Sequence, residues 1–412
     1  MKIKNIIQKI KTKDGKVLVG NFLSLSTLQL AGMILPLFTL PYLIKILGFK
    51  NYGILAIANS LVAYFSSVTD YSFNITATRD VSKHRNSLKQ LNLIYSKVMM
   101  VQGMFLLLSL LSIYLIVISY EPFRKHSDIF FIVATGLIGN VLIPQWFFQG
   151  IEKMKFIAII SLIVKVLFTA SIFIFIKTKN DLDIYAWLIS SGSIISGLIG
   201  QLILYVRFKI NFILLPFKHI IQTIKSNFPV FVNQIFPLMY NNTSTFLLGF
   251  FVAENLTGIY AALKKITDLS TTLLKTISRV FFPFLNRRVE AFGNYRKLML
   301  WTTGVGLLLL IALYPLVFMF LSIKDESAIY VHVFLCLSLV GFVLYDIYGL
   351  NYLIVHRKDK IVMKNTIFTS VTGFILAFPL IYYFGIIGAA VNLFIARLLM
   401  GLGVMLRSRN VS

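Results

Sequence analysis

The chain has 412 residues, of which 58% are apolar and only 13% are charged, and its mean hydropathy is +0.82. Soluble domains carry about 25% charged residues, so this composition excludes a water-soluble enzyme and predicts an integral membrane protein. The formal net charge of +25 comes from 40 basic and 15 acidic residues, and a single cysteine, Cys336, excludes a disulfide scaffold.

Twelve apolar segments are each long enough to cross a membrane, because a bilayer core of about 30 Å needs roughly 20 helical residues. The first follows basic residues, is too long for a signal peptide and lacks a cleavage pattern, so we expect a retained anchor. The eighth is the least apolar, because it holds several lysines and arginines and one aspartate. The predicted spans are residues 17–46, 51–74, 94–119, 128–149, 157–177, 184–206, 228–252, 258–285, 298–322, 328–354, 362–383 and 388–406.

Basic residues are distributed unevenly between the predicted loops. The two tails and the alternate loops hold 27 of the 40 lysines and arginines, whereas the opposite loops hold only six. By the positive-inside rule, both termini are predicted to be cytoplasmic. This topology accounts for the net charge, so we expect no nucleic-acid partner.

The loops also limit the chemistry that the chain can perform. They are short, the sequence contains no G-x-x-x-x-G-K-[ST] phosphate-binding loop, and the five histidines are scattered. We therefore expect no appended ATPase, no cofactor and no metal site. Work against a gradient would be driven by ions, by the membrane potential or by removal of the substrate.

The two halves of the chain align with each other at an offset of 205 residues. Six spans in each half give the halves the same orientation, which is the parallel-repeat plan of some secondary transporters. A chance likeness between polar helical stripes is the alternative explanation. The alignment sets Gly53 on Gly258, Asn59 on Lys264, Ser66 on Thr271, Asp70 on Lys275 and Asn74 on Arg279.

The sequence thus predicts an all-α polytopic membrane protein in which twelve transmembrane helices form two six-helix lobes around a central cationic cavity. The N-terminal lobe would comprise residues 1–207 and the C-terminal lobe residues 228–412, joined by a cytoplasmic linker over residues 208–227. We expect the substrate to bind between the lobes.

Several charged residues lie on one face of the eighth predicted span. At about 100° per residue, Lys264, Asp268, Thr271, Lys275 and Arg279 form a narrow stripe. Every such charge is costly against lipid, so the stripe must meet protein or water. Lys264 and Asp268 are four residues apart, so an ion pair within the helix is the structural alternative to a coupling role for Asp268.

Two further cations lie near the middle of their predicted spans. Lys165 is central in the fifth span, too far from either end to reach the interface comfortably, and is a candidate functional residue. Arg397 is central in the twelfth span, where a ligand role and a structural bond to backbone carbonyls or to Asp346 are equally open. Trp146, Phe147 and Phe148, at the end of the fourth span, are more simply interface aromatics than a platform for a sugar.

Three segments in the first 160 residues are similar to a known family. They are ILPLFTLPYLIKILGFKNYG (34–53), DYSFNITATRDVSKHR (70–85) and PQWFFQGIEKMKFIA (144–158). They resemble the O-antigen flippases, the Wzx-type members of the polysaccharide transporter family within the superfamily of multidrug and polysaccharide exporters. The second half resembles this family in layout only. Ser72 is a departure, because the family commonly has glycine after the Asp-Tyr pair.

This resemblance implies a substrate, a route and partners. The substrate would be an undecaprenyl-pyrophosphate-linked oligosaccharide repeat unit, moved from the cytoplasmic to the periplasmic leaflet of a bacterial inner membrane by ion-coupled alternating access. A proton or a sodium ion would drive it, and other polysaccharide-assembly membrane proteins would be partners. The anionic head group would meet Lys165, Lys264, Lys265, Lys275, Arg279 and Arg397, the sugars would face Asn59, Ser66, Asn74, Asn233 and Tyr240, and the coupling ion would use Asp268, Asp70 or Asp346.

Three other classes of protein remain as alternatives. A multidrug cation exporter of the same superfamily would favour an acidic lumen, whereas the intramembrane charges here are mostly basic. A membrane polysaccharide polymerase or glycosyltransferase usually has a sizeable outward loop, and the outward loops predicted here are short. A structural scaffold would have no reason to keep Lys165 in the middle of a span. The flippase is therefore favoured, and the exporter is second.

Overall fold

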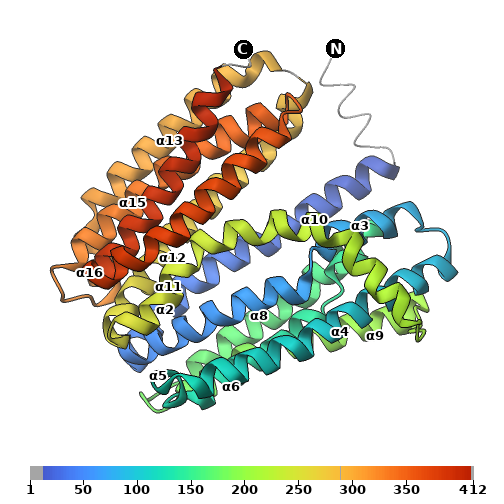
Figure 1. The fold of residues 1–412 in the computed structure, drawn as a ribbon, viewed down its shortest axis with the longest axis horizontal. Coiled ribbons are helices and arrows are strands. Elements are labelled where there is room, and N and C mark those ends of the chain that lie inside the picture. Colours follow the sequence, from blue (N-terminus) through green and yellow to red (C-terminus); the bar gives the residue numbers. More distant parts are fainter. Residues whose placement is uncertain (1–12, 288, 410–412) are drawn as a thin grey trace. The chain divides into compact units, whose positions relative to one another are not determined.

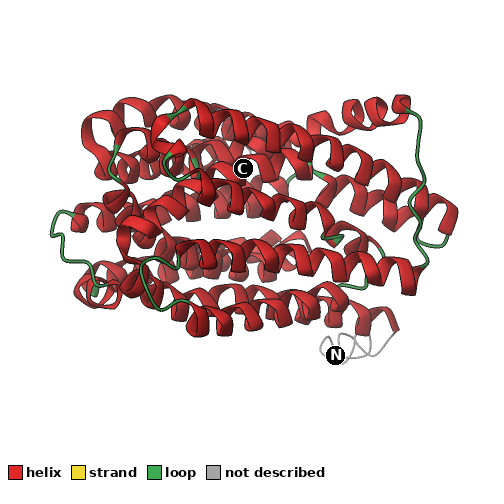
Figure 2. Ribbon diagram, turned by 90° about the horizontal axis from the view of Figure 1, so that it is seen from below, coloured by secondary structure: helices red, strands yellow, loops and turns green. Residues whose placement is uncertain are grey.

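The computed structural model describes the backbone of residues 13–287 and 289–409. Every regular element in these ranges is a helix, and none of these residues forms a strand (Figure 2). The predicted all-α class is therefore confirmed. Side chains are described from residue 32 onward, apart from Met33, Asn233, Pro237, Leu238, Met239, Tyr240, Val280, Pro283, Phe284, Asn286, Arg287, Arg288 and Val289.

The helices follow one another through short connections (Figure 1). In the first half of the chain they are α2 (Lys13–Asp70), α3 (Phe73–Lys83), α4 (Leu88–Ser119), α5 (Glu121–Arg124), α6 (Ser127–Leu142), α7 (Gln145–Gly150), α8 (Lys155–Phe175) and α9 (Leu182–Phe208). In the second half they are α10 (Phe217–Asn241), α11 (Thr243–Phe251), α12 (Glu254–Arg287), η1 (Val289–Ala291), α13 (Phe292–Ala312), α14 (Tyr314–Leu321), α15 (Ala328–Leu344), the π-helix η2 (Tyr345–Ile354) and α16 (Asp359–Ser408).

Eight helical stretches of the described residues are long and apolar enough to cross a membrane. Two of them, Ile34–Lys83 and Asp359–Ser408, have 50 residues each, and a 50-residue helix would extend about 75 Å, more than two bilayer cores. Each contains a glycine with a non-helical backbone, Gly48 in the first and Gly385 in the second. Each stretch is therefore long enough for two spans. The multi-pass membrane class is confirmed, and the number of twelve spans stays a prediction.

Packing divides the chain into two compact units, and each is described by itself. Unit 1 comprises residues up to Thr39 together with Val62–Val232, and unit 2 comprises Leu40–Leu61 together with Asn233–Ser412. The middle of α2, Leu40–Leu61, thus packs with the C-terminal half of the chain. The predicted lobes, which place all of α2 in the N-terminal lobe, stay a prediction about membrane topology.

Unit 1 has an aromatic core. Trp146, Phe147 and Phe148 of α7 are at most 2% exposed, and they cluster with Phe73 of α3. The ring of Phe148 lies 6.1 Å from that of Phe208 in α9. The interpretation of Trp146, Phe147 and Phe148 as interface aromatics is therefore wrong, because the tight turn before α7 folds these rings into the interior of the unit.

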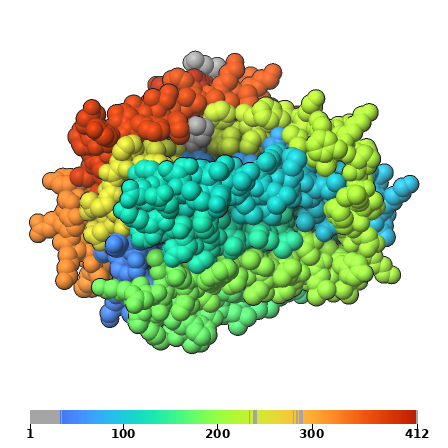
Figure 3. All heavy atoms as spheres, turned by 60° about the horizontal axis from the view of Figure 1, so that its bottom comes forward, coloured from blue at the N-terminus to red at the C-terminus, as the bar shows by residue number. Residues whose placement is uncertain are grey.

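The outer surface of α4 has the character expected of a helix in lipid. Leu107, Leu108, Leu111 and Leu115 are more than half exposed, and a space-filling view shows the side chains of α4, in cyan to teal, forming a continuous outer surface (Figure 3). Exposed leucines of this kind stabilise a protein only where acyl chains replace water. This surface agrees with the membrane class.

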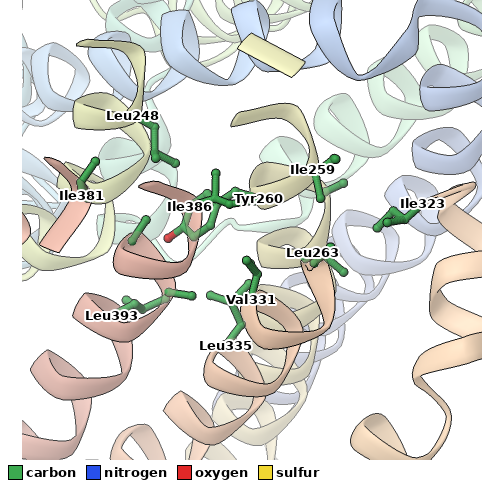
Figure 4. Packing of buried hydrophobic residues seen from close by; sticks show 14 of the residues in the cluster. Leu248, Ile259, Tyr260, Leu263, Ile323, Val331, Leu335, Ile381, Ile386 and Leu393 are labelled. Carbon is green, nitrogen blue, oxygen red and sulfur yellow. The ribbon is translucent and has the colours of Figure 1, made fainter. Parts of the chain in front are cut away.

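Unit 2 has an aliphatic core built on α11, α12, α15 and α16. Tyr260 and Leu263 of α12 are fully buried, and they gather with Val331 and Leu335 of α15 and Leu393 of α16 (Figure 4). Burying this side of α12 fixes the rotation of the helix about its own axis. The rotation in turn determines where the charged residues of α12 lie.

The two glycines that the repeat alignment pairs meet in unit 2. A Cβ on Gly53 would overlap the carbonyl of Glu254, and a Cβ on Gly258 would overlap the carbonyl of Phe49. Phe49 and Glu254 are themselves 205 residues apart, so the two overlaps are equivalent under the alignment. A nearby ion pair joins Lys50 Nζ to Glu254 Oε2 at 3.7 Å. The aligned glycines therefore allow α2 and α12 to cross with their backbones in direct contact.

Candidate functional site

Helix α12 carries the predicted charged stripe. It is continuous from Glu254 to Arg287, so the helical spacing assumed from the sequence is realised. Lys264 Nζ donates to Asp268 Oδ2 at 2.7 Å. The intrahelical ion pair allowed by the sequence spacing is therefore present. The side chains of Lys265, Lys275 and Arg279, which belong to unit 2, are exposed on the surface of the protein.

Arg397 of α16 is 3% exposed and is held by three partners. Its guanidinium donates to Ser338 Oγ at 3.0 Å and to Asn241 Oδ1 at 3.3 Å, and it lies 3.7 Å from Asp268 Oδ1. The alternative that Arg397 pairs with Asp346 is wrong, because Asp268 takes that place. One carboxylate thus lies between two cations, Lys264 and Arg397.

An aromatic ring extends this cationic group along α12. Lys275 Nζ lies 5.3 Å from the ring centre of Phe342, and Arg397 Cζ lies 6.0 Å from the same centre. Cations at such distances are attracted to the face of the ring. We call the group the α12 cluster, and its five cations outnumber its single carboxylate: Lys264, Lys265, Lys275, Arg279 and Arg397, with Asp268.

Asp346 lies in a different environment, in which its hydrogen-bond donors are neutral and Lys275 is a nearby charge. It is 1% exposed in the π-helix η2, and its Oδ2 accepts from Tyr295 Oη at 2.7 Å and from Asn351 Nδ2 at 3.2 Å. The same Asn351 Nδ2 lies 2.8 Å from Ser278 Oγ. A π-helix bonds residue i to residue i+5, which stacks Asn351 over Asp346. We call these four residues the Asp346 network.

A small polar cavity lies in unit 1 where α2 ends. Asp70 is the last residue of α2, Tyr71 and Ser72 have positive φ angles, and α3 begins at Phe73. This sharp junction brings Asn74 Nδ2 within 2.6 Å of Asp70 Oδ1. The cavity has a volume of about 170 Å³. We call it the Asp70 pocket, and it is lined by Ser66, Thr69, Asp70, Asn74, Gln102, Asn140, Ile143, Gln145 and Trp146.

Lys165 lines a larger cavity in the same unit. The Lys165 cavity has a volume of about 430 Å³ and lies between α2, α8 and α9. The Lys165 Nζ atom lies beside the backbone of Gly32, 3.3 Å from where a Cβ would be. The other lining residues are mainly apolar, with hydroxyl groups among them. Ile143 lines both this cavity and the Asp70 pocket, so the two cavities adjoin.

The residues predicted to face sugar are not gathered in one place. Ser66 and Asn74 both line the Asp70 pocket. Asn59 belongs to unit 2, where its Nδ2 donates to the carbonyl of Leu55 in its own helix at 2.9 Å. The side chains of Asn233 and Tyr240 lie outside the described residues. A sugar-facing role for these five residues stays a prediction.

Sequence reasoning missed several polar groups that the structure places at these sites. Tyr295 and Ser278 join the Asp346 network from other helices, and Gln102 and Asn140 line the Asp70 pocket from α4 and α6. None of them stands out in the sequence, because each is a single neutral polar residue in an apolar helix. A polar residue in a span is itself a weak signal of function.

The fold is that of a multi-pass membrane protein, and its helix α12 carries a group of charged residues. The chain belongs to the polysaccharide biosynthesis protein family, which it matches over residues 18–289. It is 26% identical over 384 residues to a protein of Escherichia coli (strain K12) named "Putative O-antigen transporter", covering 90% of this chain and 92% of that protein. The resemblance inferred from the three sequence segments is thereby confirmed.

Two solved structures share the fold. The lipid II flippase MurJ in an inward closed conformation superposes with a TM-score of 0.74 at 15% identity, covering 95% of this chain and 87% of that one. An inward-facing multidrug resistance transporter of the MATE family in the MOP superfamily gives 0.58 at 13% identity, covering 92% and 98%. At such identities the likeness defines the fold alone.

Proposed function

We propose that the chain is a flippase that moves undecaprenyl-pyrophosphate-linked O-antigen or polysaccharide repeat units from the cytoplasmic to the periplasmic leaflet of a bacterial inner membrane. It acts as a transporter and not as an enzyme, by ion-coupled alternating access, with both termini in the cytoplasm. The O-antigen transporter of Escherichia coli, to which the chain is similar along most of its length, supports this substrate class.

The α12 cluster is the observation that carries the proposal. A pyrophosphate brings at least two negative charges, and a cluster with five cations and one carboxylate attracts them. The Lys264 and Arg397 charges are partly balanced by Asp268. Lys275 and Arg279 are exposed and would meet the head group directly, and Lys165 would offer a further cation in unit 1. An organic cation, by contrast, would be repelled.

We further propose that Asp346, and not Asp268, binds the coupling ion. Asp268 already has two cationic partners, so it keeps its negative charge without any bound ion. Asp346 is buried, and its hydrogen-bond donors Tyr295 and Asn351 are neutral. Burying a carboxylate is costly, and a bound proton or sodium ion would lower that cost in addition to the electrostatic attraction of Lys275. The remaining candidate, Asp70, lies in a polar pocket that suits a different role.

A reconstituted assay tests the flippase. Liposomes containing the purified chain and an undecaprenyl-pyrophosphate-linked oligosaccharide are treated with an external sugar-specific reagent, and the exposed fraction is followed in time. We expect the native chain to flip the lipid and Lys275→Ala to flip it at least tenfold more slowly, as for loss of one charge-assisted contact. Lys125→Ala is the control, because Lys125 is an exposed lysine that pairs with Glu121.

The same liposomes separate the alternatives. If the native chain moves no such lipid but extrudes an organic cation, the multidrug exporter replaces the flippase. If Lys275→Ala and Lys125→Ala flip equally fast, the α12 cluster does not bind the head group. For coupling, we expect Asp346→Asn to lose the dependence of flipping on an imposed proton or sodium gradient. Persistence of that dependence in Asp346→Asn would return the role to Asp268 or Asp70.

A further inference from the structure

The lining of the Asp70 pocket is unusually polar for a cavity in an apolar helical unit. It includes one carboxylate, on Asp70, and four carboxamides, on Asn74, Gln102, Asn140 and Gln145. Two hydrogen bonds already connect lining residues: Asn74 Nδ2 to Asp70 Oδ1 at 2.6 Å and Asn140 Nδ2 to Ser66 Oγ at 3.3 Å. Carboxamides both donate and accept, so the wall offers both kinds of group to a ligand.

Two lining residues carry buried polar atoms that have no hydrogen-bond partner among the described residues. Gln102 is 3% exposed and its Oε1 lacks a donor, and Trp146 is 2% exposed and its Nε1 lacks an acceptor. A buried polar group left unpaired is destabilising, and native structures keep few of them. One acceptor and one donor together match hydroxyl groups, because each hydroxyl supplies both a proton and lone pairs.

The volume of the Asp70 pocket and the charge of its lining residues limit the ligands that it can bind. The pocket has a volume of about 170 Å³, which is room for roughly five or six water molecules and suits one sugar ring. Among the residues that the structure describes, no lysine or arginine lines it, and Asp70 would repel an anion, which argues against a phosphate. The apolar side chains among its described lining residues are Ile143 and part of Trp146, which is too little apolar surface for a hydrophobic drug.

The Lys165 cavity shares the lining residue Ile143 with the Asp70 pocket, so both can contact one ligand. The Lys165 cavity is mainly apolar and has one cation, and it meets the Asp70 pocket at Ile143. An apolar cavity with a cation, beside a polar pocket, provides the three kinds of surface that a lipid-linked sugar requires. That molecule has an apolar chain, then a phosphate, then a sugar. Between them, the two cavities of unit 1 therefore offer a matching surface to each of its three parts.

We propose that the Asp70 pocket holds one sugar ring of the lipid-linked substrate and determines which sugar is transported, while the adjoining Lys165 cavity holds the phosphate and the first part of the polyprenyl chain. This inference rests on the proposed flippase function and adds a specificity site to it. In this arrangement Asp70 accepts hydrogen bonds from sugar hydroxyls and does not bind the coupling ion.

The test measures sugar preference in the full-length reconstituted chain. The probes are undecaprenyl-pyrophosphate lipids that each carry one sugar, drawn from a panel of hexoses and N-acetylhexosamines, and the flipping rate of each is compared. Gln102→Leu is the main variant, since it is nearly isosteric and removes the unpaired carbonyl. Asn140→Leu is the second variant, from another wall. We expect the native chain to prefer one sugar and both variants to reduce that preference at least tenfold.

A matched control lies on the same helix. Ser109 of α4 is 1% exposed and its hydroxyl also lacks a partner, but it does not line the pocket. Ser109→Ala should raise the thermal unfolding midpoint, as Gln102→Leu should, because each removes an unsatisfied buried group. Only Gln102→Leu should also change the sugar preference. A gain in stability with a loss of preference is a combination that a purely structural Gln102 would not produce.

The outcomes are distinguishable. If the native chain flips none of the panel, the flippase proposal fails and the pocket proposal falls with it. If the native chain flips the lipids and both pocket variants keep its sugar preference, the pocket proposal alone is overturned. Equal slowing of every lipid by both variants also overturns it, because a sugar site must discriminate between sugars.

Discussion

Ser72, between α2 and α3, combines two unfavourable features. Its φ angle is 64°, in the left-handed region that favours glycine, and its buried hydroxyl has no partner among the described residues. Ser72→Gly would remove both. We expect it to raise the free energy of unfolding by about 1 kcal/mol, because the relief of backbone strain exceeds the added entropy of the unfolded chain. Thermal unfolding in detergent measures this as a higher midpoint.

Ser72→Ala separates the two causes. It removes the hydroxyl but keeps the Cβ that the left-handed backbone disfavours. A stabilisation by alanine equal to that by glycine would show that the hydroxyl, and not the backbone, is responsible. Both variants should leave the hydrogen bond between Asn74 and Asp70 in place. Sugar preference should then be unchanged, since the junction keeps its course.

Asp268 has a structural role that can be measured apart from transport. Asp268→Asn would leave the buried Arg397 without an anionic partner, with Ser338 and Asn241 as hydrogen-bond partners and the Phe342 ring nearby. We expect a loss of about 1–3 kcal/mol of stability, the range for a buried polar group that loses its partner. Glu121→Gln is the control, because Glu121 forms an exposed ion pair with Lys125 at the same four-residue spacing, and such pairs contribute only about 0.3–0.5 kcal/mol.

A null result for Asp268→Asn would mean that the Arg397 charge is accommodated without the carboxylate. The double variant Lys264→Met/Asp268→Asn adds a second check. If the three residues act as one network, the two substitutions will not be additive in stability. Additive effects would instead mean that Lys264, Asp268 and Arg397 do not stabilise the protein as one network.

At the level of the helices, the crossing of α2 and α12 depends on two glycines. In Gly258→Ala, the new Cβ would overlap the carbonyl of Phe49, and in Gly53→Ala it would overlap that of Glu254. Neither neighbour is a flexible side chain, so the helices must separate. We expect each variant to lose about 1–3 kcal/mol of stability, the usual cost of overpacking, measured by thermal unfolding.

Because the repeat alignment pairs Gly53 with Gly258, the double variant provides a stricter test of the shared crossing. Because the two overlaps lie at the same crossing, the first substitution already separates the helices, and the double variant should cost much less than the sum of the two. Gly304→Ala is the control, since a Cβ there would meet nothing within 4 Å. A large effect of Gly258→Ala beside a negligible effect of Gly53→Ala would contradict a shared crossing.

Spacing along one helix was predictable from the sequence, whereas partners on other helices were not. Residues three or four apart must be neighbours on a helix, so the Lys264–Asp268 pair followed from the spacing alone. The partner of Arg397 depended on how α16 packs on α12, and the sequence left Asp346 as an equal alternative. The π-helix at Asp346 was also unforeseen, because one extra residue per turn leaves no sign in an apolar segment.

For the whole molecule, the composition predicted the class of protein, but it did not predict how the chain divides into two packing units. Apolar content alone predicted a helical membrane protein, because only helices or closed barrels satisfy the backbone in lipid. The division of α2 between the two units was not foreseen. The alignment identified Gly53 and Gly258 as equivalent, but equivalence does not imply contact. That they touch explains why Leu40–Leu61 packs with the C-terminal half.

The membrane topology turns on α12, whose charges keep it outside the eight stretches that qualify as spans by composition. If α12 crosses the membrane, Ala253 before it and Arg296 after it lie on opposite sides, and the positive-inside rule puts Arg296 in the cytoplasm. Cysteines introduced at these exposed positions report this directly. In a Cys336→Ser background, a membrane-impermeant maleimide applied to intact spheroplasts should label Ala253→Cys and leave Arg296→Cys unlabelled until the cells are opened.

Reference positions calibrate the labelling. Lys179→Cys, in a predicted outward loop, should label like Ala253→Cys, and Arg85→Cys, in a predicted inward loop, like Arg296→Cys. Labelling of Ala253→Cys and Arg296→Cys from the same side would mean that α12 does not cross, and the count of twelve would fall. Opposite labelling would require the stripe from Lys264 to Arg279 to lie within the membrane. Charges at that depth are retained only against protein or water, as transport of an anionic head group requires.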